Sequence, residues 1–143
     1  MNQGDFDGAV EGFRLALEPL LNGDPAPVLD FWSRRDDVTL ANPFGPPCRG
    51  PAAVVRATEE ASDHFRDGSV RHIEEVSRYS TPDLGYIVQL EETEAKLPGS
   101  ETMTSFTLRV TMIFRREGDA WKISHRQADS ITTARPVSSL VEA

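Results

Sequence analysis

The stretch DVTLANPFGPPCRGPAAV, residues 37–54, joins a short strand to a helix through a rigid turn. A β-like run over residues 38–41 stops at Asn42, and four prolines and two glycines follow within the next nine residues. Asparagine before proline is a common turn residue. The same position also allows the Asn42 amide to line the mouth of a pocket, and both interpretations stay open.

The length and composition predict one globular domain. The chain has 143 residues, of which 38% are hydrophobic and 27% are charged, and a chain of this size buries enough surface to fold without crosslinks. We therefore expect a single domain over residues 1–143. Its core should cover about residues 5–130, and residues 131–143 should form a loosely held tail.

The charge argues against several classes of partner. A formal net charge of −8 is repelled by phosphate backbones and by anionic membrane surfaces, so we expect neither nucleic acid nor a membrane as a partner. The single cysteine, Cys48, excludes an intramolecular disulfide and a cysteine-based zinc site. The first ten residues lack the basic start and apolar centre of a signal peptide, and we expect a cytoplasmic location.

The order of the predicted elements indicates an α+β fold. Apolar residues at three- and four-residue steps predict a first helix over residues 5–22, and cap and turn residues predict two more over 25–34 and 51–65. Alternating patterns between turn residues predict a short strand at 38–41 and long strands over 70–79, 85–96, 102–116 and 120–129. Three helices on the concave side of such a curled sheet would leave a pocket at one end.

The last predicted strand carries the main candidate site. Trp121, Ile123, His125, Gln127 and Asp129 share one face by the two-residue period of a strand. Because the first two are apolar, we expect this face to point inward and to carry the other three side chains into the interior. A histidine near a carboxylate suits acid–base catalysis. The alternatives are a polar network that satisfies itself, or a strand end with Asp129 in solvent.

Three aromatic residues are candidates for the pocket wall: Trp32, Phe44 and Tyr86. Core packing is the alternative for each of them. Adjacent acidic pairs such as Glu91-Glu92 are interpreted as solvated faces, because neighbouring side chains on a strand point apart. The sequence shows no phosphate loop, no serine triad and no metal-binding spacing, so we expect no metal and no cofactor.

The segments DDVTLANPFGPPCRG (36–50) and WKISHRQAD (121–129), within this order of elements, resemble the nuclear transport factor 2-like superfamily and its SnoaL-like branch over residues 5–130. The resemblance implies a cone-shaped, curved antiparallel sheet wrapped by three N-terminal helices, also called a ketosteroid isomerase-like or cystatin-like α+β barrel. It also implies a deep pocket and a homodimer. In that fold the residue before the proline turn faces the cavity.

The ketosteroid isomerases of this superfamily differ from the chain at their active site. Asn42 stands where they have a catalytic aspartate, and an amide cannot act as that base. Met112 stands where they have a protonated aspartate. The SnoaL-like polyketide cyclases use acid–base residues in the same cavity, and here His125 and Asp129 could take that role. Gln127 stands where many relatives have a second histidine.

Three hypotheses follow. The first is an isomerase, cyclase or hydratase-like enzyme acting on a small, largely apolar molecule, with proton transfer by His125 and with Asp129 as its orienting partner. The second is a non-catalytic protein that binds such a molecule through Trp32, Phe44 and Tyr86. The third is a dimeric assembly module whose outer sheet face presents Arg109, Thr111, Ile113, Lys122, Ser124 and Arg126.

Overall fold

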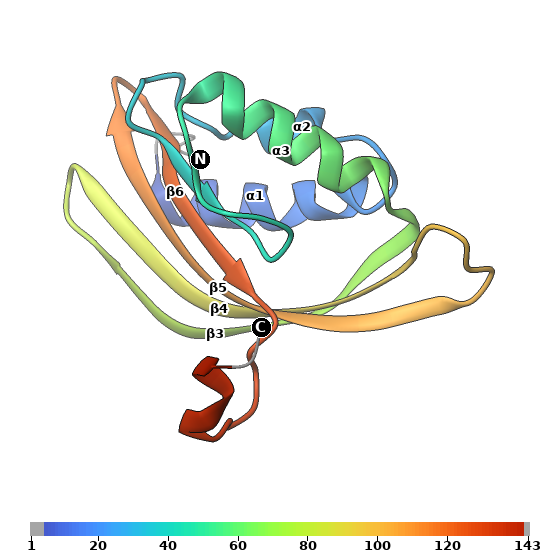
Figure 1. Cartoon of the computed structure of the whole chain (residues 1–143). Helices are drawn as coiled ribbons and strands as arrows, with labels where there is room; N and C mark the ends of the chain where they lie inside the picture. Colours follow the sequence, from blue (N-terminus) through green and yellow to red (C-terminus); the bar gives the residue numbers. More distant parts are fainter. Residues whose placement is uncertain (1–4, 142–143) are drawn as a thin grey trace.

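The structure is a computed structural model that describes residues 5–141 (Figure 1). It confirms the predicted fold, a curved sheet covered by three helices. The helices are α1 (Phe6–Leu20), α2 (Ala26–Leu29) and α3 (Pro51–Asp63), and a 3₁₀ turn, η1 (Val137–Val141), follows the last strand. The strands are β1 (Thr39–Ala41), β2 (Cys48–Arg49), β3 (Arg66–Ser80), β4 (Leu84–Lys96), β5 (Met103–Glu117) and β6 (Ala120–Asp129).

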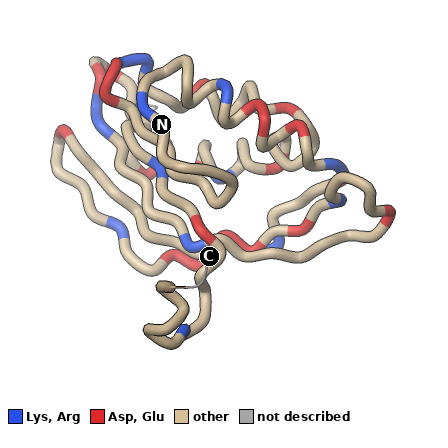
Figure 2. The backbone as a smooth tube through the Cα atoms, in the orientation of Figure 1, with Lys and Arg blue, Asp and Glu red and all other residues tan. Residues whose placement is uncertain are grey.

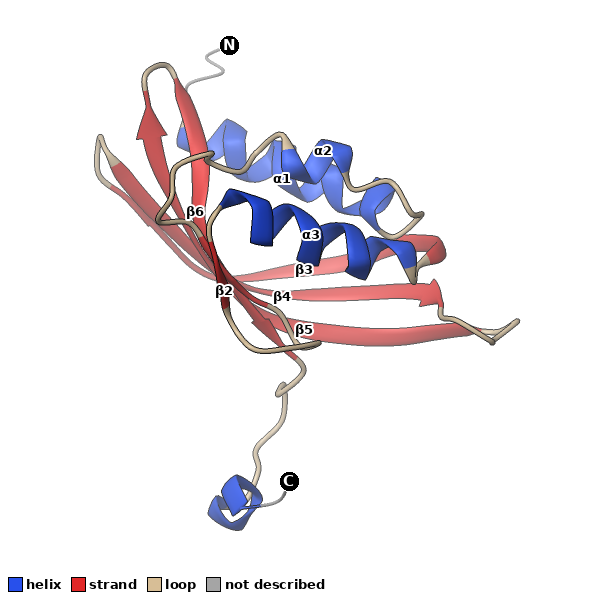
Figure 3. Ribbon diagram, turned by 45° about the horizontal axis from the view of Figure 1, so that its top comes forward, coloured by secondary structure: helices blue, strands red, loops and turns tan. Residues whose placement is uncertain are grey.

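One open sheet holds all six of these strands, in the order β2-β1-β6-β5-β4-β3. The strands β3 to β6 form an antiparallel meander, whereas β1 runs parallel to β6 and makes the sheet mixed. The three helices lie on the concave side, and η1 lies on the convex side beyond the end of β6 (Figures 1 and 3). The sheet and helices therefore enclose one interior.

The second helix is shorter than the sequence predicts. It ends at Leu29, and Trp32 instead forms an isolated bridge with Ile123 of β6. The backbone amide of Ile123 donates to Phe31 at 2.7 Å, and the Ser33 amide donates to Ile123 at 3.0 Å. The pairing with β6 therefore replaces the last predicted helical turns.

The start of β3 also differs from the prediction, because Gly68 lies inside the strand and not in a turn before it. A side chain at Gly68 would meet the carbonyl oxygen of Leu21 at 2.7 Å. Only glycine therefore allows the strand to pass this close to the end of α1.

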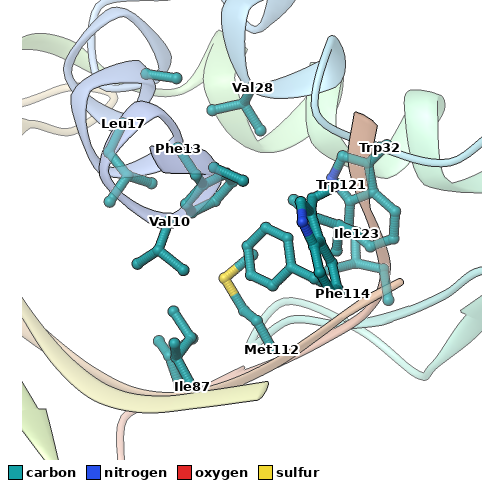
Figure 4. Close-up of a cluster of buried hydrophobic side chains, with 14 of the residues drawn as sticks. Val10, Phe13, Leu17, Val28, Trp32, Ile87, Met112, Phe114, Trp121 and Ile123 are labelled. Carbon is teal, nitrogen blue, oxygen red and sulfur yellow. The ribbon is translucent and has the colours of Figure 1, made fainter. Parts of the chain in front are cut away.

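The hydrophobic core lies between α1 and the concave face of the sheet (Figure 4). Asp5 caps α1 by accepting a hydrogen bond from the Asp7 amide at 3.0 Å. The buried side chains of α1 recur at the spacing of one helix face, and they pack against apolar side chains of β4, β5 and β6: Phe6, Ala9, Val10, Phe13, Ala16 and Leu17 from the helix, with Ile87, Met112, Phe114, Trp121 and Ile123 from the sheet.

A β-bulge at Ser124 decides which residues of β6 face the interior. Ile113 and Phe114 are consecutive in β5, but their partners in β6 are His125 and Ile123, so Ser124 is an extra, unpaired residue. An extra residue shifts the alternation of a strand by one position. Trp121 and Ile123 face inward before the bulge, and Arg126 and Ala128 are the buried residues after it.

The inward orientation predicted for His125, Gln127 and Asp129 is therefore wrong. The bulge turns these three side chains to the convex face of the sheet, where each is only partly buried. Arg126, which the sequence pattern placed on the outer face, points into the interior instead. The sequence pattern could not show this, because an unbroken two-residue alternation gives the opposite assignment.

The turn over residues 42–48 carries no charged residue, whereas α3 and the strands carry many (Figure 2). In η1 the side chains of Val137, Leu140 and Val141 are exposed. No helix among residues 5–141 is both long and apolar enough to cross a membrane.

Candidate functional site

A cavity of about 80 Å³ lies between the helices and the concave face of the sheet. Its wall is mostly apolar and comes from all three helices, from the proline turn and from the strands β1, β4, β5 and β6. The lining residues are Phe13, Leu17, Leu20, Leu21, Val28, Trp32, Leu40, Asn42, Pro43, Phe44, Thr58, Ala61, Phe65, Glu91, Thr93, Phe106, Leu108, Arg126 and Ala128.

A buried ion pair forms one part of this wall. The two terminal nitrogens of Arg126 donate to the two carboxylate oxygens of Glu91 at 2.8 and 2.9 Å. Glu91 is 2% exposed and Arg126 is 9% exposed. The guanidinium also lies 5.5 Å from the ring centroid of Phe13, which adds a cation–π contact, and it approaches the sulfur of Met112 at 3.4 Å.

A chain of hydrogen bonds connects the ion pair to the surface of α1. The side-chain amide of Gln89 donates to Glu91 Oε2 at 2.8 Å, and its carbonyl oxygen accepts from Arg14 at 2.7 and 3.0 Å. Arg14 also pairs with Glu11 at 3.1 Å and with Glu75 at 2.9 Å. Both ends of the Gln89 amide are thus fixed, so its orientation toward Glu91 is set.

These contacts keep Glu91 ionised. Burial by itself would raise the pKa of Glu91, but the Arg126 guanidinium, the Gln89 amide and the more distant Arg14 outweigh it. The pKa of Glu91 therefore lies below its ordinary value of 4.5. At neutral pH the cavity wall carries one negative and one positive charge in direct contact.

Most of the remaining polar groups of the cavity are satisfied by the protein. Thr58 donates to the Val54 carbonyl at 2.8 Å, and Thr93 donates to the Phe106 carbonyl at 3.1 Å. Asn42 accepts from the Phe44 amide at 3.1 Å, which is the turn role that the sequence predicts for it.

Three side chains of the wall keep N–H groups without a protein partner. Within residues 5–141, the Nε–H of Arg126, the indole N–H of Trp32 and the amide N–H groups of Asn42 donate no hydrogen bond to the protein. In the same part of the chain, no fully buried side-chain nitrogen lacks a partner, so all three groups keep accessible surface. Because the three residues line the cavity, these donors are candidates for contact with a ligand there.

Aromatic side chains surround the outer part of the cavity. The rings of Phe65 and Phe106 are stacked with centroids 5.7 Å apart, and Phe44 of the proline turn lies 6.4 Å from Phe65. Phe44 is 65% exposed, so it marks the side on which the cavity meets solvent. A groove beside α3 shares Asn42, Phe44 and Ala61 with the cavity.

The residues predicted for the site separate into three groups, in the cavity wall, in the core and on the convex face. Trp32, Asn42 and Phe44 line the cavity. Met112 is fully buried beneath Arg126, and Tyr86 lies on the convex face with its ring 6.1 Å from Tyr79. Gln127, His125 and Asp129 lie on the convex face as well.

The predicted acid–base pair is not assembled. His125 Nδ1 lies 2.7 Å from the hydroxyl of Thr39, whereas Asp129 accepts from Arg109 at 2.7 Å and from Gln127 at 2.8 Å. Residues four apart along a strand lie roughly 13 Å apart. Burial would raise the pKa of Asp129, but the hydrogen bonds from Arg109, the Ile131 amide and Gln127 lower it. The partners of the Asp129 carboxylate are therefore these three groups and not His125.

Sequence reasoning missed Glu91, Gln89 and Arg126. The prediction that the Glu91-Glu92 pair is solvated is wrong for Glu91. A signal was present in β4, because Ile87, Gln89, Glu91, Thr93 and Ala95 alternate on one face and apolar residues stand at both ends of the series. For Arg126 the sequence offered no such signal, since only the bulge turns it inward.

The model of the SnoaL-like domain family matches residues 13–132. The chain belongs to the SnoaL-like domain family. Among functionally curated proteins, none matches this SnoaL-like chain.

Solved structures agree with this assignment. A ketosteroid isomerase-like protein from Erwinia carotovora is 14% identical with a TM-score of 0.71, over 89% of this chain and 94% of that one. A candidate dehydratase of the nuclear transport factor 2-like family from Streptomyces avermitilis is 20% identical with a TM-score of 0.66, over 87% and 92%. A candidate association domain of calcium/calmodulin-dependent protein kinase type II from Thiobacillus denitrificans is 21% identical with a TM-score of 0.72, over 89% and 95%.

At these identities the likeness establishes the fold alone. The three proteins carry names from different functional classes, so the function of this SnoaL-like domain has to be argued from its own cavity. Within residues 5–141, no group of three or more His, Cys, Asp or Glu side chains is arranged to hold a metal ion.

Proposed function

We propose that this SnoaL-like domain binds a small, largely apolar molecule in the cavity, with the polar end of that molecule at Glu91 and Arg126. The observation that carries the proposal is an apolar cavity whose wall includes a buried, bidentate ion pair. Buried ion pairs add little to stability compared with apolar side chains of similar volume. An apolar wall with a few placed polar groups is typical of ligand sites.

The volume limits what the cavity holds. Ligand pockets commonly measure roughly 300–1,000 Å³, and an engineered cavity of about 150 Å³ holds benzene. At about 80 Å³ this cavity is narrower than the deep pocket that the family resemblance implies. The ligand is therefore a small molecule, or one end of a longer molecule that extends outward past Phe44.

Proton transfer by His125 and Asp129 has no support from their positions, because both side chains lie on the convex face. Among the lining residues that the structure describes, the ionisable groups are Glu91, whose pKa lies below its ordinary value, and Arg126, and arginine is not deprotonated in proteins. A general acid or base works best with a pKa near the working pH. We therefore propose binding and assign no isomerase, cyclase or hydratase-like reaction.

Filling the cavity tests the proposal. Native mass spectrometry on protein purified without added ligand detects retained small molecules, and NMR titration with small ketones, phenols and amides measures binding.

Ala128→Leu places extra volume in the cavity, and Thr111→Leu adds side-chain volume on the convex face as the matched control. Binding should disappear in Ala128→Leu and persist in Thr111→Leu, with thermal unfolding confirming that both variants fold. Retained binding in the filled variant contradicts the proposal.

A homodimer through the convex sheet face is the second candidate function. Tyr79 and Tyr86 are exposed there, and Ile113, which pairs with Tyr86, is half-buried. We propose a second copy of the chain as their partner. Sedimentation equilibrium should show a dimer at micromolar concentration, and Tyr86→Asp should convert it to a monomer. A monomeric parent protein contradicts this candidate.

The composition supports the remaining predictions. A single cysteine fits the cytoplasmic location that we propose, and the net charge of −8 fits the absence of a nucleic-acid partner.

A further inference from the structure

We infer that the polar end of the ligand is electrically neutral and carries both a hydrogen-bond acceptor and a donor, as an amide does. The inference rests on the proposed function and narrows it, because it excludes carboxylates and ammonium or amidinium groups as the preferred ligands. The ion pair of Glu91 and Arg126 carries it.

The charges of the cavity wall are balanced. Among the lining residues that the structure describes, only Glu91 and Arg126 carry charge, and their side chains contact each other through two hydrogen bonds. A ligand carboxylate beside this pair would leave one negative charge uncompensated in a buried apolar site, and a ligand cation would leave one positive charge. Both situations are costly because a buried charge without a partner loses its hydration.

The next charges outward from the ion pair contact one another. Arg14 is the cation that approaches the pair through Gln89, and its guanidinium contacts the carboxylates of Glu11 and Glu75. Arg78 also contacts Glu75, at 2.6 Å. The charge of Arg14 is therefore offset by carboxylates that contact it, so Arg14 is not a free partner for an anionic ligand.

The unused hydrogen-bonding capacity has both signs. Arg126 keeps one donor, its Nε–H, as described above. Glu91 Oε2 accepts from Arg126 and Gln89, whereas Oε1 accepts from Arg126 alone. A carboxylate oxygen accepts about two hydrogen bonds, so Oε1 retains one. A primary amide supplies a carbonyl oxygen for the first group and an N–H for the second.

Three probes of nearly equal shape test the inference: benzamide, benzoate and benzamidinium. They differ in charge but hardly in shape, so any steric cost of entering the cavity is common to all three. A second series, with a cyclopropyl ring in place of the phenyl ring, repeats the test with smaller molecules. We expect the parent protein to bind benzamide at least about tenfold more tightly than either ion, as measured by NMR titration. Preference for benzoate or benzamidinium overturns the inference but leaves the proposed cavity function standing. Binding of no probe in either series overturns both.

Charge-changing variants sharpen the test. Glu91→Gln leaves Arg126 without its counter-ion, so the preference should move to benzoate by about tenfold or more. Arg126→Gln leaves Glu91 unpaired, so the preference should move to benzamidinium. Thermal unfolding establishes whether each variant folds, and the selectivity of the parent protein stands as a test without them. An unchanged order of affinities in a folded variant contradicts the role of the ion pair.

Discussion

Arg126 and Glu91 form a bidentate ion pair although their strands, β6 and β4, are not neighbours in the sheet. β5 lies between them, so the two strands are roughly 10 Å apart. The two long side chains bridge this distance across the concave face, above Met112 of β5. The pair thus links three strands and also forms part of the cavity wall.

Removing one member of the pair should destabilise the domain strongly. Glu91→Leu leaves the guanidinium of Arg126 buried without its counter-ion, and we expect a loss of about 3–5 kcal/mol in the free energy of unfolding. The double variant Glu91→Leu/Arg126→Met removes both charges and should lie much closer to the parent protein. Urea unfolding of Glu91→Leu, of Arg126→Met and of the double variant measures the coupling. Equal losses in all three variants would show that the pair does not act as a unit.

The acid stability of the domain should depend on Glu91. Its pKa in the folded protein lies below the ordinary value of 4.5, so its ionised form adds stability above that pH. This contribution is lost as the pH falls below 4.5 and through the folded pKa. Urea midpoints measured from pH 7 to pH 3 should therefore decline more steeply in the parent protein than in Glu91→Leu/Arg126→Met. Parallel declines would rule out Glu91 as a source of the acid dependence.

Gln89 should act as a positioning residue for Glu91. Gln89→Leu removes the amide that donates to Glu91, and it also leaves the Nε–H of Arg14 without its acceptor, so we expect a loss of about 1–3 kcal/mol in stability. The pKa of Glu91 should rise relative to the parent protein, as measured by ¹³C NMR of the side-chain carboxyl. Thr111→Val on the convex face is the control. A stability loss without any change in that pKa would limit Gln89 to a packing role.

Substitution of His125 should leave the cavity unaffected. His125→Ala removes the contact with Thr39 on the convex face, and we expect benzamide affinity to stay within about twofold, because the ring does not reach the cavity wall. Trp32→Ala, which removes part of the wall, should weaken binding. NMR titration of both variants provides the comparison. Lost binding in a folded His125→Ala protein would restore the site that the sequence pattern predicts.

The sequence predicts the architecture well, because the spacing of apolar residues and turn residues is local. The face of α1 that includes Val10, Phe13 and Leu17 follows from helical periodicity, and β6 has the predicted bounds. The turn after Asn42 follows from its prolines. These features depend on the preferences of neighbouring residues, so tertiary contacts change them little.

The candidate site was less predictable, because it depends on contacts between distant parts of the chain. Glu91 and Arg126 are separated by 35 positions in the sequence. Their ion pair can be recognised only when the positions of β4 and β6 in the sheet are known. The sequence predicts Trp32 in a helix, but its pairing with β6 replaces the helical turn. Glu91 alone could have been found from the alternation along β4.

The bulge at Ser124 has a consequence for the comparison of related chains. One inserted residue in β6 determines whether an imidazole or a guanidinium faces the interior. For residues after position 124, alignment with a homologue does not show that two aligned residues have the same functional role, even where they are identical. Two relatives with the same last nine strand residues can present opposite chemistry to the same cavity if only one of them has the bulge.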